Sequence, residues 1–233
     1  MPSLSVVIPA LNEEARLPRL LDALDASHPA PDEVVVVDGG STDATSEIAR
    51  ARARLVTAPR GRASQQNAGA GAARGDVLWF LHADCVPPPA ATAEIAAAIE
   101  LGAPGGCFLV AFGESERRRH PLLPAIERGI NARTRWTRTG TGDQGIFVRR
   151  DVFRRMGGFP PWPLFEDVAL FAGLRAAGRP AVCRGPLVTS ARRWLAHGPA
   201  RVMALMWGLR LAYLAGVPPA RLARWWRMRL TAL

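Results

Sequence analysis

The first hundred residues alternate between short β-branched stretches and longer segments with apolar residues at helical spacing. The pattern predicts strands at residues 4–8, 34–37, 54–57 and 77–81, with helices at 13–26, 44–53, 63–73 and 90–101. Strands that alternate with helices pair in parallel through right-handed crossovers, so we predict an α/β fold with a mostly parallel central sheet flanked by helices. Ligands of such sheets bind beyond the carboxyl ends of the strands, and we expect the chemistry there.

The second half is less regular. We predict strands at 107–112 and 145–148, a helix at 166–177, and two C-terminal helices at 199–215 and 219–230. Residues 114–142 are interpreted as an irregular excursion rich in Arg and Thr. The glycines at 140, 142 and 145 match the letters of the dinucleotide fingerprint, but a strand pattern follows where the fingerprint requires a helix. A nicotinamide or flavin site is therefore disfavoured.

The charge is unevenly distributed. The net charge is +10, all 30 basic residues are Arg, and the residues after Asp167 include eleven Arg and no acid. Such a half is suited to phosphates, on a nucleotide, a nucleic acid or an anionic membrane. The 3 Cys lack Cys-x-x-Cys spacing, which disfavours a disulfide scaffold or a zinc ribbon. With no signal-peptide pattern and no apolar run of spanning length, we expect a cytoplasmic protein.

Carboxylates follow several of the apolar stretches. Asp38 closes a Val strand, where it can accept hydrogen bonds from a base or a ribose hydroxyl, or serve in a turn. Asp84 can hold a hard divalent cation beside substrate phosphates, or cap the next helix. Glu166 and Asp167 lie among apolar residues, where a partly buried carboxylate of raised pKa can act as a general base. A pair of acids that starts a helix is the alternative interpretation.

Several segments together resemble the family 2 glycosyltransferases of the GT-A fold. They are SVVIPALNEE at 5–14, VVVDGGSTD at 35–43, LHAD at 81–84, GDQG at 142–145, the acid pair at 166–167, and SARRW at 190–194. The last is similar to the Q-x-x-R-W motif of processive members. The combination of HAD, GDQG and ARRW resembles one bacterial subfamily, associated by name with radical-SAM and selenium-domain neighbours and with arsenosugar biosynthesis.

The resemblance implies a Rossmann-like GT-A domain over residues 1–195, with a nucleotide-binding half at 1–100 and an acceptor-side half at 101–195. Amphipathic helices would follow at 196–233. It also implies an inverting, metal-dependent transfer from a nucleotide-diphosphate sugar, with a UDP-sugar favoured. Residues expected to bind this donor are Pro9, Asn12, Glu13, Asp38, Asp43, Arg62, Asn67, Arg192 and Arg193. The two adjacent arginines suit the departing diphosphate, because guanidinium groups match phosphate oxygens.

The catalytic base implied by the resemblance is Asp167, with Glu166 beside it. Mn²⁺ or Mg²⁺ is expected on Asp84. His82 is at the position where the family has the first Asp of Asp-x-Asp. It either ligates the metal or is a buried residue that contacts the metal ligands. Residues expected on the acceptor side are Asp143, Gln144, Trp136 and Trp194, the tryptophans as stacking surfaces for a sugar or the acceptor. A Ser at 190 in place of Gln favours a single transfer, to a small-molecule or lipid acceptor, over polymerisation.

Other functions share parts of this pattern. A nucleotidyltransferase would use the same strand-end carboxylates without needing Asp167 as a base. A non-catalytic protein that binds anions or membranes would use only the Arg-rich half. The basic, Trp-bearing residues 199–230 are typical of helices in a membrane interface, which predicts peripheral contact at the inner face of the cell membrane; packing on the domain is the alternative. With no recognition-helix signature, nucleic acid is not expected as a partner.

Overall fold

The protein is described by a computed structural model that covers residues 1–231, except for the side chains of residues 227 and 229–231. The last two residues of the predicted C-terminal segment, 232–233, thus lie outside the described residues. The described part contains one seven-stranded sheet in the order β3-β2-β1-β4-β6-β5-β7. The strands are β1 (Leu4–Ala10), β2 (Glu33–Asp38), β3 (Arg54–Thr57), β4 (Val77–Phe80), β5 (Gly105–Phe112), β6 (Phe147–Arg149) and β7 (Ala181–Thr189).

The sheet is mostly parallel. β1 pairs in parallel with β2 and β4, β2 pairs in parallel with β3, and β5 pairs in parallel with β7. β6 runs antiparallel to both of its neighbours, β4 and β5. The carboxyl ends of β1, β2 and β4 therefore meet at one edge, and the α/β prediction is confirmed.

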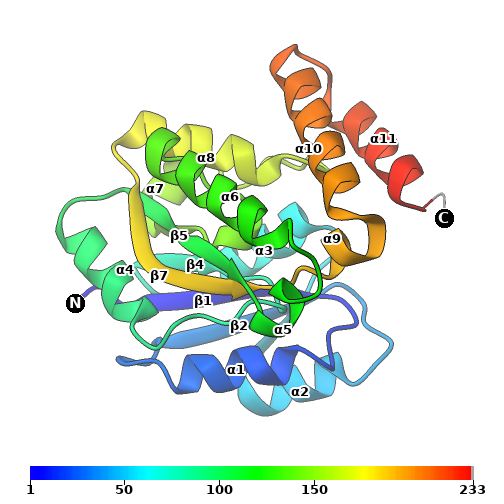
Figure 1. The fold of residues 1–233 in the computed structure, drawn as a ribbon. Helices are drawn as coiled ribbons and strands as arrows, with labels where there is room; N and C mark the ends of the chain where they lie inside the picture. The colour runs from blue at the N-terminus through cyan, green and yellow to red at the C-terminus, as the bar shows by residue number, and fades with distance from the viewer. Residues whose placement is uncertain (232–233) are drawn as a thin grey trace.

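Helices cover both faces of the sheet (Figure 1). They are α1 (Leu17–Asp25), α2 (Thr45–Arg52), α3 (Arg62–Ala72), α4 (Ala91–Glu100), α5 (Glu114–Arg117), α6 (Leu123–Thr137), the short 3₁₀ helix η1 (Gly142–Gln144), α7 (Arg150–Arg155), α8 (Glu166–Ala177), α9 (Arg192–His197), α10 (Pro199–Leu214) and α11 (Pro219–Thr231).

Alternation along β1 builds the two core layers. Val6 and Ile8 pack with α1, α2 and α4 on one face, whereas Val7 packs with α3, α7 and α8 on the other. Because side chains of a strand point to opposite faces in turn, a strand buried on both sides is continuously apolar, as the β1 and β2 sequences are.

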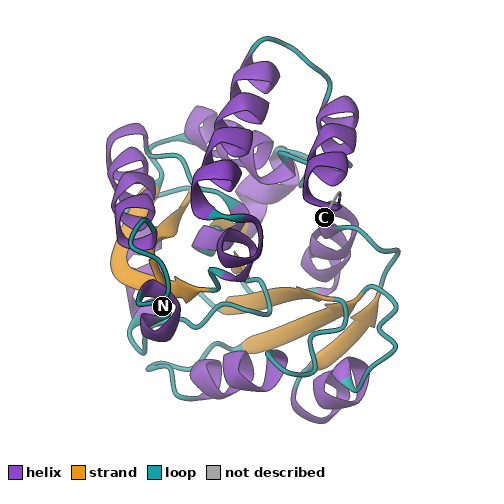
Figure 2. Ribbon diagram, turned by 45° about the vertical axis from the view of Figure 1, so that its right-hand side comes forward, coloured by secondary structure: helices purple, strands orange, loops and turns teal. Residues whose placement is uncertain are grey.

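Helices α10 and α11 form a hairpin that stands away from the sheet and contacts α9 (Figures 1 and 2). Its Tyr213 packs on Trp162 and Phe165, in the loop before α8. Among the described helices, none is both long and apolar enough to cross a membrane.

The irregular excursion predicted at 114–142 is wrong, because α6 occupies residues Leu123–Thr137. Leu123, Ile126 and Thr134 form its buried face, at a helical spacing that intervening Arg and Thr residues obscured. No strand was predicted at β7, whose middle is Arg184-Gly185-Pro186. A shift in the β5–β7 register between Phe108 and Leu109 accommodates that interruption.

Candidate active site

The loops after β1 and β2 are tied together at the carboxyl edge of the sheet. Asn12 adopts a left-handed backbone conformation, with φ of 53°. Its backbone N–H donates to Ser41 Oγ at 3.0 Å, and its side-chain Oδ1 accepts from the Thr42 N–H at 2.9 Å. Gln65 of α3 donates from Nε2 to the carbonyls of Ala10 and Val37, both at 2.9 Å. The edge is thus held in a fixed shape.

Asp38, at the end of β2, is 5% exposed and faces its own turn. Its carboxylate accepts from the N–H groups of Gly40 and Ser41 and from the Ser41 hydroxyl. Burial alone raises the pKa of Asp38, but the hydrogen bonds from Ser41, Ser46 and Gly40 outweigh it and lower that pKa below its usual value. The carboxylate is therefore ionised at neutral pH, which suits it to accept hydrogen bonds from a base or a ribose hydroxyl.

Three further predicted donor residues occupy the same edge. Pro9 lies within β1, opposite Val37 of β2. Asp43 accepts from the backbone N–H groups of Thr45 at 3.0 Å and Glu14 at 3.2 Å. Its two carboxylate oxygens thus connect the loop after β2 to the loop after β1. Glu13 pairs through Oε2 with Arg16 at 2.9 Å and is 17% exposed at its side chain.

Asp84 lies in the turn after β4, which closes with a bond from the Cys85 N–H to the His82 carbonyl at 3.0 Å. Arg192 of α9 bridges this turn to the β1 loop, since its Nη2 is 3.6 Å from Asp84 Oδ2 and 3.4 Å from Glu13 Oε1. Burial raises the pKa of Asp84, Arg192 opposes that rise, and Glu13 then adds to it. Residues far apart in sequence thus surround one carboxylate.

Glu166 and Asp167 begin α8; Glu166 is buried and Asp167 is partly buried. Asp167 is held by the backbone: Oδ2 accepts from the Gly142 N–H at 2.6 Å and Oδ1 from the Val168 N–H at 2.7 Å. Burial raises the pKa of Asp167, and these two hydrogen bonds work against the rise. Burial, and next the charge of Asp167, raise the pKa of Glu166 to about 7. Of the pair, Glu166 is the better place for a proton at neutral pH.

His82 is placed beside this pair. A Cβ added at Gly142 would lie 3.1 Å from His82 Nε2 and 3.4 Å from Asp167 Oδ2, so the ring and the carboxylate flank the same point of η1. Burial, followed by the charges of Arg62 and Arg193, lowers the pKa of His82 to about 3. The imidazole is neutral, and its place is next to the general-base candidate.

Arginines converge on the site from both halves of the chain. Arg62 starts α3, and its charge lowers the pKa values of His82, Glu166 and Asp167 after the larger effect of their burial. Burial, and next Arg62, lower the pKa of Arg193. Arg193 also lies over the ring of Trp226 in α11, with 5.4 Å between its Cζ and the ring centroid. A cluster of cations that repel one another favours a bound anion.

The remaining predicted residues are placed differently. Both amide atoms of Asn67 are bonded to the backbone of Phe159, with Nδ2 on its carbonyl and Oδ1 on its N–H. Gln144 is fully buried, donates to the Phe108 carbonyl at 3.0 Å and accepts from Arg133 at 2.9 Å. These two side chains stabilise the fold through their hydrogen bonds. Asp143, by contrast, is close enough for its charge to raise the pKa values of Asp84 and Asp167.

The two predicted stacking tryptophans also differ. Trp136 is 90% exposed, on the last turn of α6. Trp194 is partly buried and packs on Phe112 with ring centroids 6.3 Å apart. The sequence did not predict that Tyr213 lies near the site or that Trp226 contacts Arg193. The pattern of α10 and α11 does not indicate which side of each helix packs against the rest of the protein.

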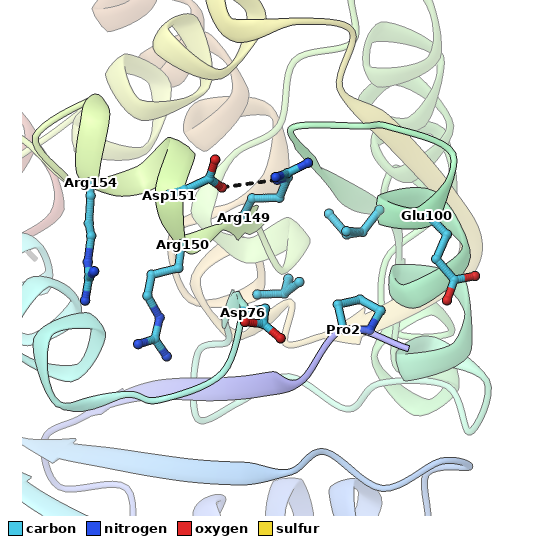
Figure 3. A pocket seen from close by; sticks show the side chains of 9 residues that line it. Pro2, Asp76, Glu100, Arg149, Arg150, Asp151 and Arg154 are labelled. Atoms are coloured by element: carbon cyan, nitrogen blue, oxygen red, sulfur yellow. Dashed lines mark hydrogen bonds and ion pairs between the residues drawn. The ribbon is translucent and has the colours of Figure 1, made fainter.

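A pocket of about 500 Å³ lies elsewhere, at the start of β4 and the end of β6 (Figure 3). Of its charged lining residues, Arg149 pairs with Asp151 at 3.1 Å, and Asp76 accepts from Ser3. It is at the opposite ends of the strands from the cluster described above. The carboxyl edge remains the candidate active site.

Comparison with known proteins decides the family. Residues 5–157, more than half of the chain, match the family model described as glycosyl transferase family 2. The chain belongs to this family. The match includes the β1, β2 and β4 loops that carry Asn12, Asp38 and Asp84.

Curated relatives agree. Validoxylamine A glucosyltransferase of Streptomyces hygroscopicus subsp. limoneus is 35% identical over 137 residues, which are 54% of this chain and 30% of that protein. A PGL/p-HBAD biosynthesis glycosyltransferase of Mycobacterium bovis is 40% identical over 91 residues, 36% of each chain. The aligned segments thus span about a third of the length of these curated relatives.

Solved structures share the fold. Glucosyl-3-phosphoglycerate synthase from Mycobacterium tuberculosis, crystallised with Mn²⁺, UDP and glucosyl-3-phosphoglycerate, has a TM-score of 0.57 at 22% identity, covering 84% of this chain and 78% of that one. S. aureus TarS 1–349 in complex with UDP has a TM-score of 0.62 at 22% identity, covering 81% and 60%. The GT-A fold expected from the sequence is confirmed.

The residues present fit a divalent cation that is held jointly with a diphosphate. Hard cations such as Mg²⁺ take oxygen ligands, often only one or two carboxylates together with substrate phosphates. Asp84 offers such a carboxylate, partly buried near Glu13 and Asp143. An added positive charge would offset the repulsion from these acids, which adds to the effect of burial in raising the pKa of Asp84. Within the part of the chain that is described, no three His, Cys, Asp or Glu side chains are grouped to hold a metal by themselves.

Proposed function

We propose that this family member is an inverting, metal-dependent glycosyltransferase. It would move one sugar from a nucleotide-diphosphate sugar, with a UDP-sugar favoured, to a hydroxyl of a small-molecule or lipid acceptor. The similar proteins support a UDP-sugar as the donor, since the two solved structures reported above contain UDP. One observation carries the proposal: the acid pair Glu166–Asp167 and the carboxylate of Asp84 lie with Arg62, Arg192 and Arg193 at one edge of the sheet.

The donor would lie along the carboxyl ends of β1 and β2. Asp38 is ionised and buried, which suits hydrogen bonds from ribose or base. Asn12 and Glu13 line the same edge, next to the Asp84 turn that Arg192 bridges to the β1 loop. The diphosphate would then meet the arginines from α3 and α9, whose planar donors match phosphate oxygens.

The transfer itself needs a base opposite the leaving group. Asp167 would take the proton of the acceptor hydroxyl while that oxygen bonds to the anomeric carbon. The bond from that carbon to the diphosphate breaks, and the nucleoside diphosphate leaves with the electron pair. Attack from the face opposite the leaving group inverts the anomeric configuration.

Each neighbour of Asp167 has a distinct part in this step. The N–H groups of Gly142 and Val168 fix both carboxylate oxygens, and Glu166 carries the proton that the pair retains near neutral pH. Arg192 and Arg193 would hold the charge that develops on the departing diphosphate. A divalent cation on Asp84, when bound, supplies further stabilisation of that charge.

Nucleotide binding tests the proposal directly. Thermal unfolding is measured with UDP, GDP, dTDP and CDP, each with and without Mn²⁺, on the wild type and on Asp84→Ala. A ligand at about 100 times its dissociation constant stabilises the folded state by roughly 2.7 kcal/mol, which is easily detected. We expect a Mn²⁺-dependent shift for one nucleotide, UDP first, and its loss in Asp84→Ala.

An exposed acid provides the matched control. Asp151→Ala removes a carboxylate that pairs with Arg149 and Arg155 near the opposite edge of the sheet, and the nucleotide shift should persist. No shift with any nucleotide would overturn the transferase proposal and favour a non-catalytic anion-binding protein. A metal-dependent shift that survives in Asp84→Ala would remove Asp84 as the metal ligand.

A further inference from the structure

Helix α10 has apolar side chains on opposite sides. Val202 and Leu209 are buried on the side that faces the body of the protein. Trp207, Leu211 and Leu214 are 59%, 62% and 72% exposed. At about 3.6 residues per turn the exposed three form one stripe, directed away from the buried side. A helix that is apolar all round usually lies in a core or against a membrane, and here one side has no cover within the described residues.

Helix α11 adds positive charge to this hairpin. Arg221 and Arg224 are exposed there, beside Trp225 and Met228, which are 41% and 60% exposed. Residues 168–233 contain eleven Arg and no Asp or Glu, so no acid within this stretch of the chain balances them. The hairpin therefore combines exposed tryptophan and leucine with uncompensated arginine.

We propose that this hairpin docks on an anionic lipid surface. The docking face consists of Trp207, Leu211, Leu214, Arg221, Arg224 and Trp225. Helices that lie in a membrane interface bury Trp and Leu at the headgroup boundary while their Arg side chains meet anionic lipids. A second copy of the chain is a poorer occupant, because a two-fold interface would bring together two patches of the same positive charge.

The docking face belongs to the helices that border the proposed active site. On α10, Tyr213 packs on Phe165 with ring centroids 5.0 Å apart, and Phe165 directly precedes Glu166. On α11, Trp226 stacks on Arg193. Docking would thus hold the site close to the lipid surface, within reach of an acceptor carried there. Only this last step rests on the proposed function.

Vesicle co-sedimentation of the full chain, without nucleotide, tests the docking. We expect the wild type to pellet with vesicles of equal parts phosphatidylcholine and phosphatidylglycerol, and not with phosphatidylcholine alone. Trp207→Ser combined with Leu211→Ser should weaken partitioning by tenfold or more, since the two apolar side chains together contribute over about 1.4 kcal/mol when buried. Arg221→Gln with Arg224→Gln should weaken it by roughly fivefold per arginine.

Matched controls change the same residue types elsewhere. Leu101→Ser alters an 89% exposed leucine after α4, and Arg175→Gln with Arg179→Gln removes two exposed charges at the end of α8. Both should pellet like the wild type. Failure of the wild type to bind anionic vesicles, equal losses in controls and docking variants, or a dimer in sedimentation velocity that only the docking variants lose, would each overturn the proposal. The nucleotide shift in solution is a separate readout, so failure here leaves the transferase proposal standing.

Discussion

At the scale of single residues, two adjacent carboxylates have unequal surroundings. Asp167 accepts two short backbone hydrogen bonds, whereas the Glu166 carboxylate accepts one, from its own backbone N–H. Since hydrogen bonds to a charged carboxylate favour its ionised form, the arrangement keeps Asp167 able to accept a proton. The burial of Glu166 favours its neutral form. The pair can therefore share one proton at neutral pH and still contain a base.

Asp167→Asn tests that division of roles. The amide keeps the shape of the side chain but cannot take a proton, so the rate of nucleotide release from the donor sugar should fall by roughly a hundred- to ten-thousand-fold. Nucleotide binding with Mn²⁺ should change little, because Asp167 is not placed at the diphosphate. The measurement is release of the nucleoside diphosphate in parallel with the thermal shift, with Asp151→Asn as control. Wild-type turnover in Asp167→Asn would remove Asp167 from the mechanism.

Glu166 predicts a pH dependence of stability. Burial, and next Asp167, raise the pKa of Glu166 from its ordinary value of 4.5 to about 7. Between these values the folded protein binds more protons than the unfolded chain, so stability is lost as pH rises through this interval. The loss is complete above pH of about 7 and reaches roughly 3 kcal/mol at most. Glu166→Gln keeps the neutral shape and removes this titration.

We therefore expect the melting temperature to fall less in Glu166→Gln than in the wild type as pH is raised from about 5 to about 8. The measurement is thermal unfolding across that interval for both proteins. Glu47→Gln is a suitable control, because that carboxylate is in the first turn of α2, away from the acid pair. Identical pH profiles for Glu166→Gln and the wild type would show that Glu166 is ionised throughout.

At the scale of elements, α11 supports the site through one aromatic contact. Trp226 lies under Arg193, whose own pKa is lowered by burial and by Arg62. A cation over an indole ring gains about 0.5–2 kcal/mol, so Trp226→Leu should weaken nucleotide binding by roughly two- to thirtyfold. The measurement is a titration with UDP and Mn²⁺ in solution. Trp225→Leu changes the neighbouring, exposed indole and should leave that affinity unaltered; equal losses in both variants would contradict the role of the stack.

Helices and strands were predicted best where local composition and hydrophobic pattern indicated the same element. The strand at 54–57 and the helix at 166–177 have the predicted bounds, and each β/α unit of the first half is present. Prediction failed where local composition and tertiary packing disagree. α6 carries many Arg and Thr residues around a narrow apolar face, and β7 contains a Gly-Pro pair that a bulge in its pairing tolerates. Neither packing partner can be read from the sequence near these elements.

The features of the site also divide into those that could be predicted from the sequence and those that could not. Carboxylates at strand ends could be expected at one edge, because parallel strands bring their ends together. The amide bonds of Asn67 to Phe159 and the buried position of Gln144 could not, since both depend on residues brought from far along the chain. The same holds for Tyr213 and Trp226, which reach the site only because the hairpin folds back over α9 and the α8 loop.

At the scale of the whole molecule, the candidate site joins the two halves of the chain. Asn12, Asp38 and Asp84 come from the first half, whereas Asp167 and Arg193 come from the second. Within the single sheet, the antiparallel strand β6 connects the strands of the first half to β5 and β7, pairing with β4 on one side and β5 on the other. A nucleotide sugar with its metal would therefore contact segments that are more than a hundred residues apart.

Hydrogen exchange should reveal this bridging. We expect UDP with Mn²⁺ to slow amide exchange in residues 11–16 and 38–46 of the first half and also in 190–197 of the second, because ligand binding opposes local opening of every segment that it contacts. UDP with a chelator should give little protection. Residues 97–103, at the end of α4, serve as an internal control that exchanges alike in all samples. Protection confined to the first half would mean that α9 and its arginines do not contact the diphosphate. The donor site would then consist of the β1, β2 and β4 loops alone.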